Sequence, residues 1–227
     1  MIDFQNVSKK FPDGTEALAD INLKITEGEF VFIIGPSGAG KTTILRLITS
    51  DLVPTTGKMF VDGQDLAKLK DPKIPEFRRK IGTVFQDYKL LHDRTLFENI
   101  ALSLEILGKT EAEITHEVGE VLKKVGLSGK ENYFPIQLSG GEAQRTSIAR
   151  AVIASPKIVL ADEPTADLDP ATEWEIISLL DTINKAGKTV VMATHKAEVV
   201  NTMGKRVVQL EKGKIVSDLK KGKYEVS

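Results

Sequence analysis

Apolar and polar positions along the chain predict strands of two kinds. Residues 2–11 and 18–26 alternate apolar with polar side chains, as a strand with one buried face does. A turn signal follows each of them, so we expect the chain to begin with an antiparallel sheet. Continuous apolar runs are instead typical of strands covered on both faces, and they occur within four segments: residues 30–35, 81–86, 157–164 and 188–195.

Helical periodicity lies between these buried strands. Apolar residues recur at i, i+3 and i+4 spacing in residues 95–108 and 111–127. Further helices are expected in residues 41–50, 141–154 and 171–187, and a closing hairpin is expected in residues 205–219. Strands that alternate with helices imply a largely parallel sheet with both faces covered. We therefore predict one α/β domain over residues 1–227, with a helical segment at about 87–157 between the second and third buried strands.

Composition narrows the class of protein only a little. The 227 residues are 41% hydrophobic and 28% charged, which is ordinary for a soluble globular protein. The net charge of −1 gives no sign of a nucleic-acid-binding protein. Without cysteine there is no disulfide framework and no thiolate metal site. No apolar stretch reaches 18 residues, so we expect no membrane span and a cytosolic protein.

The stretch GPSGAGKT, residues 35–42, matches the phosphate-binding loop pattern G-x-x-x-x-G-K-[ST]. It follows a buried strand and opens a helix, which is the context the pattern requires. A random chain of this size would show the pattern roughly once in a hundred times, given a glycine usage of about 7%. Backbone N–H groups would surround the phosphates at the helix N-terminus, Lys41 would reach the β- and γ-phosphates, and Thr42 would bind Mg²⁺. The residues expected to bind the nucleotide are Gly35, Pro36, Ser37, Gly38, Ala39, Gly40, Lys41, Thr42 and Thr43.

Two adjacent carboxylates end the buried strand IVLADE, residues 158–163. Asp162 at the carboxyl end of this strand suits a magnesium role beside Thr42. Glu163, the next residue, is interpreted as the base that orients and polarises an attacking water. Two acids at a strand end are a weak signal alone, but the phosphate loop upstream favours a function.

A second glycine-rich loop, LSGGEAQR at residues 138–145, also leads into a predicted helix. A single phosphate loop needs no second glycine-rich loop to bind its nucleotide. Two copies of the chain packed head to tail would need one, because each copy could then contact the nucleotide of the other. The Ser139 hydroxyl and the amides of Gly140 and Gly141 would then close on the γ-phosphate held by the other copy. The helix N-terminus would add its positive field.

The order of these motifs, followed by DLD at residues 167–169 and TH at 194–195, resembles the ATP-binding cassette (ABC) ATPase family over almost the whole chain. The resemblance implies a P-loop NTPase fold. It would have a RecA-like, mainly parallel core sheet, an N-terminal antiparallel β subdomain and a helical subdomain. It also implies that ATP is bound and hydrolysed, with Mg²⁺, at the interface of a head-to-tail homodimer.

The resemblance assigns further roles. Gln86 matches the glutamine that contacts Mg²⁺ and the attacking water and that senses the transmembrane partner. His195 matches the histidine that contacts the γ-phosphate. Asp167 and Asp169 lie in the loop that crosses to the other subunit. Phe11 stands where the family usually places a tyrosine that stacks on adenine, and a core role for its ring is also open.

Segments in the middle and at the end of the chain indicate what work the ATPase does. VFQDYKLL and TLFENIAL, in residues 84–102, and the closing segments VVNTMGKRVVQLEKGKIVSD and KGKYE, at residues 199–218 and 221–225, are similar to the cell-division ATP-binding proteins of the family, which act with the membrane protein FtsX to regulate peptidoglycan hydrolases. This resemblance implies an FtsX-like partner, docked at Gln86 and the helical segment, and a peripheral position on the cytoplasmic side of the cell membrane. PTADLDP, residues 164–170, differs from the PTGNLDP typical of that group.

Alternatives remain open at this point. The ATPases of lipoprotein release and macrolide export pair with similar membrane proteins. A soluble P-loop ATPase or kinase would need no membrane partner. A kinase, however, needs an acceptor-binding pocket or lid, and this chain has the LSGGE loop instead. A DNA-maintenance ATPase would need a coiled coil or a second cassette, which the sequence lacks. We therefore expect no nucleic-acid partner.

Overall fold

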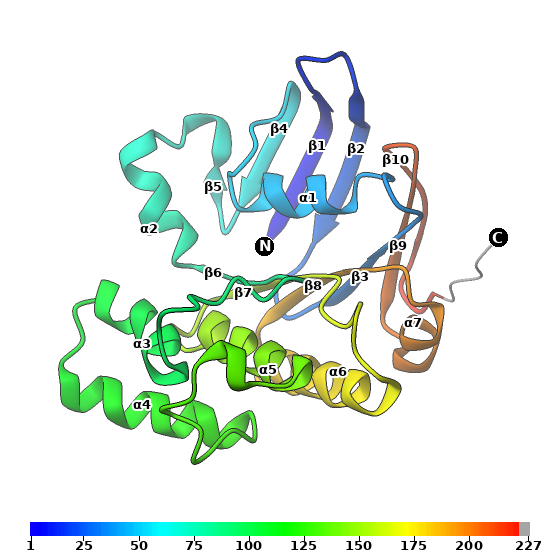
Figure 1. The fold of residues 1–227 in the computed structure, drawn as a ribbon. Helices are drawn as coiled ribbons and strands as arrows, with labels where there is room; N and C mark the ends of the chain where they lie inside the picture. The colour runs from blue at the N-terminus through cyan, green and yellow to red at the C-terminus, as the bar shows by residue number, and fades with distance from the viewer. Residues whose placement is uncertain (223–227) are drawn as a thin grey trace. The chain divides into compact units, whose positions relative to one another are not determined.

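The computed structural model describes residues 1–222, so residues 223–227 of the predicted domain lie outside the described part. The chain divides into two compact units, which are described separately (Figure 1). The first contains Met1–Arg78 and Asn184–Ser227, and the second contains Arg79–Ile183. Among the described residues, no helix has both the length and the apolar character that a membrane crossing requires.

The first unit holds two sheets. Its strands are β1 (Ile2–Lys10), β2 (Glu16–Ile25), β3 (Phe30–Ile34), β4 (Thr56–Val61), β5 (Gln64–Asp65), β8 (Thr189–Thr194), β9 (Arg206–Glu211) and β10 (Lys214–Leu219). The antiparallel sheet has the order β2-β1-β4-β5, which confirms the predicted start of the chain. In the other sheet β3 pairs in parallel with both β8 and β9, and β10 closes the predicted hairpin with β9.

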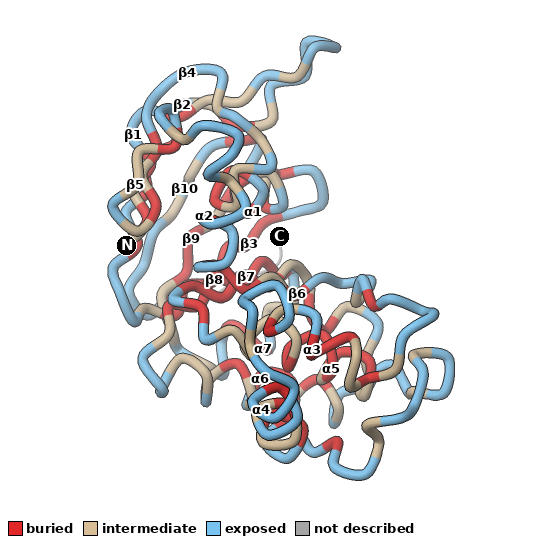
Figure 2. The backbone as a smooth tube through the Cα atoms, turned by 90° about the vertical axis from the view of Figure 1, so that its left-hand side faces the viewer, coloured by how far each residue is buried: buried red, intermediate tan, exposed pale blue. Residues whose placement is uncertain are grey.

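The burial of these strands explains their arrangement. Every residue of β3 and of β8 is buried, and the backbone of both strands is red in Figure 2. Their continuous apolar sequences therefore mark strands inside the protein. In β2 buried and exposed positions alternate over its second half, as expected for a strand with one buried face.

The helices of the first unit are α1 (Lys41–Ile48), α2 (Ile74–Arg78) and α7 (Ala197–Met203). The sequence predicted α1 but neither of the others. They have 5 and 7 residues, too few for a helical period to show. The end of α7 is set by Gly204, which adopts the left-handed conformation (φ +57°).

The second unit contains β6 (Ile81–Val84), β7 (Ile158–Asp162), α3 (Leu96–Ile106), α4 (Glu111–Lys124), α5 (Gly140–Val152) and α6 (Pro170–Lys185), which runs past its end. The strands β6 and β7 pair in parallel, and α3, α4 and α5 lie between them in the sequence. Gly82 of β6 lets α5 approach closely, because a Cβ there would lie 2.2 Å from the carbonyl oxygen of Ala151. The predicted parallel strands and helices are thus confirmed.

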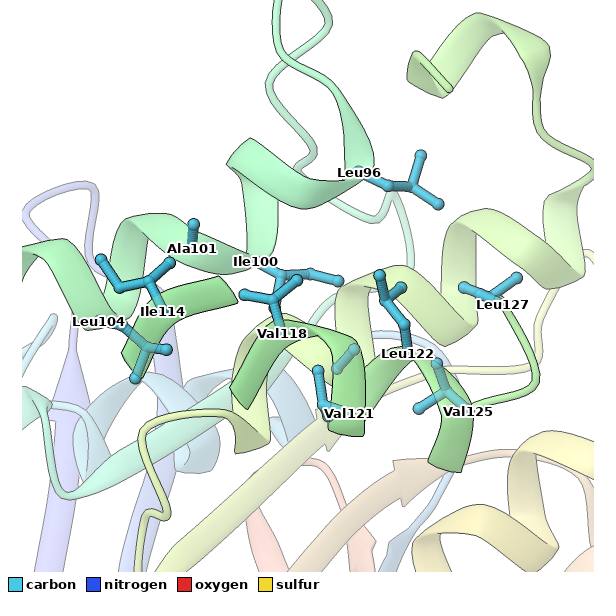
Figure 3. Close-up of a cluster of buried hydrophobic side chains, with 11 residues drawn as sticks. Leu96, Ile100, Ala101, Leu104, Ile114, Val118, Val121, Leu122, Val125 and Leu127 are labelled. Carbon is cyan, nitrogen blue, oxygen red and sulfur yellow. The ribbon is translucent and has the colours of Figure 1, made fainter. Parts of the chain in front are cut away.

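The helices of the second unit share a hydrophobic core. Figure 3 shows side chains of α3 and α4 turned toward one another, among them Ile100, Leu104, Val118 and Leu122, all of which are at most 1% exposed. Ala149 connects α5 to the same cluster. This core orients α5, which carries the second glycine-rich loop at its N-terminus.

Candidate active site

The predicted phosphate loop joins β3 to α1 in the first unit. Its three glycines have positive φ values: +148° at Gly35, +76° at Gly38 and +106° at Gly40. A Cβ at Gly35 would lie 2.2 Å from the carbonyl oxygen of Leu210, and one at Gly40 would lie 2.7 Å from that of Ala17. Close backbone neighbours therefore leave no room for a side chain at Gly35 and Gly40, and all three glycines have a conformation that L side chains rarely adopt.

Lys41 begins α1 and is 8% exposed. Its Nζ donates hydrogen bonds to the carbonyl oxygens of Gly35 (2.9 Å) and Pro36 (3.2 Å), so the ammonium group lies across the loop. No side chain caps the helix at Gly40. The first amides of a helix have no intrahelical acceptor, and with the ammonium group they suit an anion. Thr42 lies in this first turn and is exposed.

His195 belongs to the same unit as the loop. The parallel register pairs Ile34 with Thr194, so Gly35 and His195 follow at the same edge of the sheet. His195 is exposed there. Phe11 lies just after β1 and is half-buried, and the Nζ of Lys9 lies 5.5 Å from the centroid of its ring.

The predicted carboxylates lie in the second unit. Asp162 ends β7, and Glu163 follows with φ +47°. A left-handed conformation costs a non-glycine residue roughly 1–2 kcal/mol, and such strain is often found at functional sites. The pairing of Val84 with Ala161 brings Gln86 to the same edge of the sheet as Asp162.

Gln86 also meets a residue from another predicted motif. Its Nε2 donates to Oδ2 of Asp167 at 3.4 Å, so the fold joins two candidate residues that are distant in the sequence. Tyr88 lies beside this pair. Burial, and to a smaller extent the Asp167 carboxylate, raises the pKa of the Tyr88 phenol.

Ser139 is the N-cap of α5. Its Oγ accepts a hydrogen bond from the N–H of Glu142 (3.3 Å), and the Glu142 carboxylate accepts the N–H of Ser139 (2.9 Å). Lys130 forms an ion pair with Glu142, and this contact, more than the Ser139 N–H, lowers the pKa of Glu142. Because Oγ acts as acceptor in the cap, the hydroxyl hydrogen of the exposed Ser139 can donate to a ligand.

The two glycines after Ser139 are closely packed. A Cβ at Gly140 would lie 3.1 Å from the hydroxyl oxygen of Tyr88 and 3.3 Å from Cδ2 of Leu168. A Cβ at Gly141 would lie 2.4 Å from Cγ2 of Thr172, in the first turn of α6. Packing inside the unit thus requires Gly141, independently of any ligand.

Sequence reasoning missed the residues that support Gln86 and Ser139 within the second unit. Tyr88 and Lys89 both have left-handed backbones (φ +58° and +50°), and their carbonyl groups accept hydrogen bonds from Arg150 of α5. Lys130, which pairs with Glu142, was also missed. Such contacts join residues 12 to 62 positions apart, and no local pattern in the sequence marks them.

Comparison with known proteins defines the class. Residues 18–166 match the family model described as ABC transporter. The chain therefore belongs to the ABC transporter family, as its motifs predicted, and it is an ATP-binding cassette that hydrolyses ATP.

Individual relatives are more specific. The chain is 50% identical to the cell division ATP-binding protein FtsE of Bacillus subtilis (strain 168), over 99% of this chain and 98% of the relative. It is 48% identical to FtsE of Mycobacterium tuberculosis (strain ATCC 25618 / H37Rv), again over 99% and 98%. Among solved structures, the dimeric ATP-binding cassette MJ0796 in a post-hydrolysis state, bound to ADP and Pi, superposes with a TM-score of 0.90 at 39% identity, over 99% and 100% of the two chains. The predicted similarity to the cell-division group is confirmed.

Proposed function

We propose that this ATPase acts in bacterial cell division, where it drives an FtsX-like membrane protein that regulates peptidoglycan hydrolases. The observation that carries the proposal is the 50% identity to a cell division ATP-binding protein over nearly the full length of both chains. A lipoprotein-release or macrolide-type exporter is less well supported, because the relatives described above are cell-division proteins.

By the resemblance of its motifs to the family, the predicted residues would hold ATP. The phosphate loop and Lys41 would bind the β- and γ-phosphates, with His195 at the γ-phosphate and Phe11 stacked on adenine. Thr42, Gln86 and Asp162 would hold Mg²⁺, since hydroxyl, amide and carboxylate oxygens are the ligands this ion prefers. When bound, the ion would neutralise charge that develops on the phosphates.

Hydrolysis needs a water aligned with the γ-phosphorus. Glu163 would accept a proton from this water as its oxygen forms the new P–O bond and the bond to the β-phosphate oxygen breaks. Gln86 would contact the same water. The strained backbone of Glu163 supports this assignment, because a fixed base needs little reorganisation.

The second copy would complete each site. Ser139 offers a free hydroxyl hydrogen at the N-terminus of α5, and Gly140 beside it is exposed. Both are available to the γ-phosphate held by a partner cassette. The MJ0796 cassette, which is dimeric with ADP and Pi, supports a homodimer that ATP closes and hydrolysis opens.

Docking to the membrane protein would use the region of Gln86 and a helical subdomain at about residues 87–157. Exposed apolar side chains there include Phe85, Leu91 and Leu102, which are 37%, 42% and 37% exposed. A docked partner would place the cassette peripherally on the cytoplasmic side of the cell membrane.

The proposal is tested by capture of the partner. Tagged Glu163→Gln chain, which should bind ATP without turnover, is incubated with host membranes, ATP and Mg²⁺. The captured proteins are identified by mass spectrometry, with untagged chain as control. Recovery of an FtsX-like protein with envelope hydrolases supports the division role. Recovery of an export permease with lipoprotein carriers, or of no membrane protein, overturns it.

A further inference from the structure

The loop that follows Gln86 is held in an unusual conformation by a side chain of α5. Tyr88 and Lys89 are consecutive non-glycine residues in the left-handed region, which L residues rarely adopt. The guanidinium group of Arg150 donates from Nη1 to the Lys89 carbonyl (2.6 Å) and from Nη2 to the Tyr88 carbonyl (2.8 Å). Arg150 is half-buried, and this burial lowers the pKa of its guanidinium group.

The same loop also contacts the start of α5. The hydroxyl group of Tyr88 lies against Gly140, where a Cβ would be only 3.1 Å away. Gly140 and Arg150 are ten residues apart, or about 15 Å along the helix at about 1.5 Å per residue. Tyr88 therefore touches α5 twice, through its carbonyl near one end and through its side chain near the other.

Gln86 is fixed by its own contact and by this loop. Two residues separate it from Lys89, and its amide donates to Asp167 at 3.4 Å. A rotation of the Tyr88–Lys89 backbone out of the left-handed region would displace Gln86 and the Tyr88 ring together. The conformation of this loop thus decides both where the glutamine points and what contacts Gly140.

We propose that Arg150 is a positioning residue for ATP hydrolysis: its fork of two hydrogen bonds holds the loop 86–89 against α5, so that Gln86 keeps a fixed place relative to Ser139. This inference rests on the proposed role of Gln86 at the attacking water. Arg150 itself need not touch ATP. It acts on the chemical step through the backbone of Tyr88 and Lys89.

The test compares two variants of the full chain with a matched control. Arg150→Lys keeps the charge but cannot present a planar fork to two carbonyl groups, and Arg150→Met keeps only the apolar stem. The control is Arg94→Met, because Arg94 lies in the same unit with a side chain that is 56% exposed. Steady-state kcat and KM for ATP are measured together with hydrogen exchange of the amides of residues 86–91.

In both Arg150 variants we expect kcat to fall about tenfold or more, because a small displacement of a catalytic group has large effects. KM for ATP should change by less than about twofold, since the phosphate loop belongs to the other unit. Amide exchange at residues 86–91 should accelerate, and the Arg94 control should resemble wild type.

A folded Arg150→Lys chain with wild-type kcat overturns the proposal, even if its melting temperature falls, because the residue would then be merely structural. Unchanged exchange at residues 86–91 overturns it too. Gln86→Ala, measured alongside, separates this inference from the proposed function. Full kcat in Gln86→Ala removes the role of Gln86, whereas full kcat in Arg150→Lys alone removes only the positioning role.

Discussion

The packing of Gly141 leads to a quantitative prediction. A Cβ at this position would lie 2.4 Å from Cγ2 of Thr172, whereas carbon atoms in contact are about 3.5–4.0 Å apart, so about 1 Å of movement is required. Thr172 is β-branched, and its N–H is bonded to the Asp169 carboxylate at 3.1 Å, so it cannot easily yield. Overpacking of this kind costs about 1–3 kcal/mol. Replacing a helical glycine by alanine returns up to about 1 kcal/mol.

We therefore expect Gly141→Ala to lower the free energy of unfolding by up to about 2 kcal/mol. Thr172→Ser removes Cγ2 and keeps the hydroxyl group, so it removes the clash. In that background Gly141→Ala should have the opposite sign and stabilise by up to about 1 kcal/mol. The coupling between the two substitutions should be about 1–3 kcal/mol.

Urea denaturation of the wild type, both single variants and the double variant measures this coupling. Gly119→Ala is the matched control, because Gly119 lies inside α4 and, apart from its chain neighbours and the backbone of its own helix, no atom lies within 4 Å of its Cβ position. That variant should stabilise the protein by up to about 1 kcal/mol. If Gly141→Ala has the same effect in both backgrounds, the contact with Thr172 does not explain the glycine.

Four further predictions concern the site. Lys41→Ala should lose ATP binding in a nucleotide titration, and tight binding would contradict its phosphate role. Glu163→Gln should bind ATP, lose turnover and elute as a dimer on size exclusion with ATP, whereas a near wild-type rate would show that it is not the base. Gly213 has φ +77°, its N–H donates to the Ala39 carbonyl of the phosphate loop at 3.1 Å, and a Cβ there would lie 2.7 Å from a backbone oxygen. Gly213→Ala should therefore disturb the phosphate loop and raise KM for ATP more than it lowers kcat. Equal effects on the two constants would argue that Gly213 does not support the loop. Because the pKa of Glu142 is lowered in the folded protein, its carboxylate contributes fully to the free energy of unfolding at neutral pH, and this contribution is lost as the pH falls below about 4.3. The difference in free energy of unfolding between wild type and Glu142→Gln should therefore shrink on acidification. A difference that stays constant with pH would refute this linkage.

The parts of the fold that could be predicted from the sequence are those specified by local patterns. The buried strand β3 and the glycine loop after it were predicted because apolar runs and required glycines are visible in single segments. The helices α3 and α4 show both a long apolar period and complete capping boxes, in which Thr95 and Thr110 are the N-caps. These signals do not depend on what packs against them.

The remaining features depend on contacts between distant residues. The left-handed pair Tyr88 and Lys89 contains no glycine or asparagine, and the bonds from the distant Arg150 help to hold it. The fit of Gly141 against Thr172 is also a matter of tertiary packing. The sequence indicated that the second glycine loop had a use, but the structure adds a second reason for its glycine.

The hairpin β9–β10 has a consequence for how the protein becomes active during its synthesis. The phosphate loop ends near residue 43, but its Gly35 is shaped around the carbonyl of Leu210, and the Ala39 carbonyl accepts the N–H of Gly213. These neighbours are added to the chain about 170 residues after the loop ends. A growing chain therefore carries the ATP-binding motif long before the motif can take its final shape. Partly synthesised cassettes would not consume ATP or close on one another before they are nearly finished.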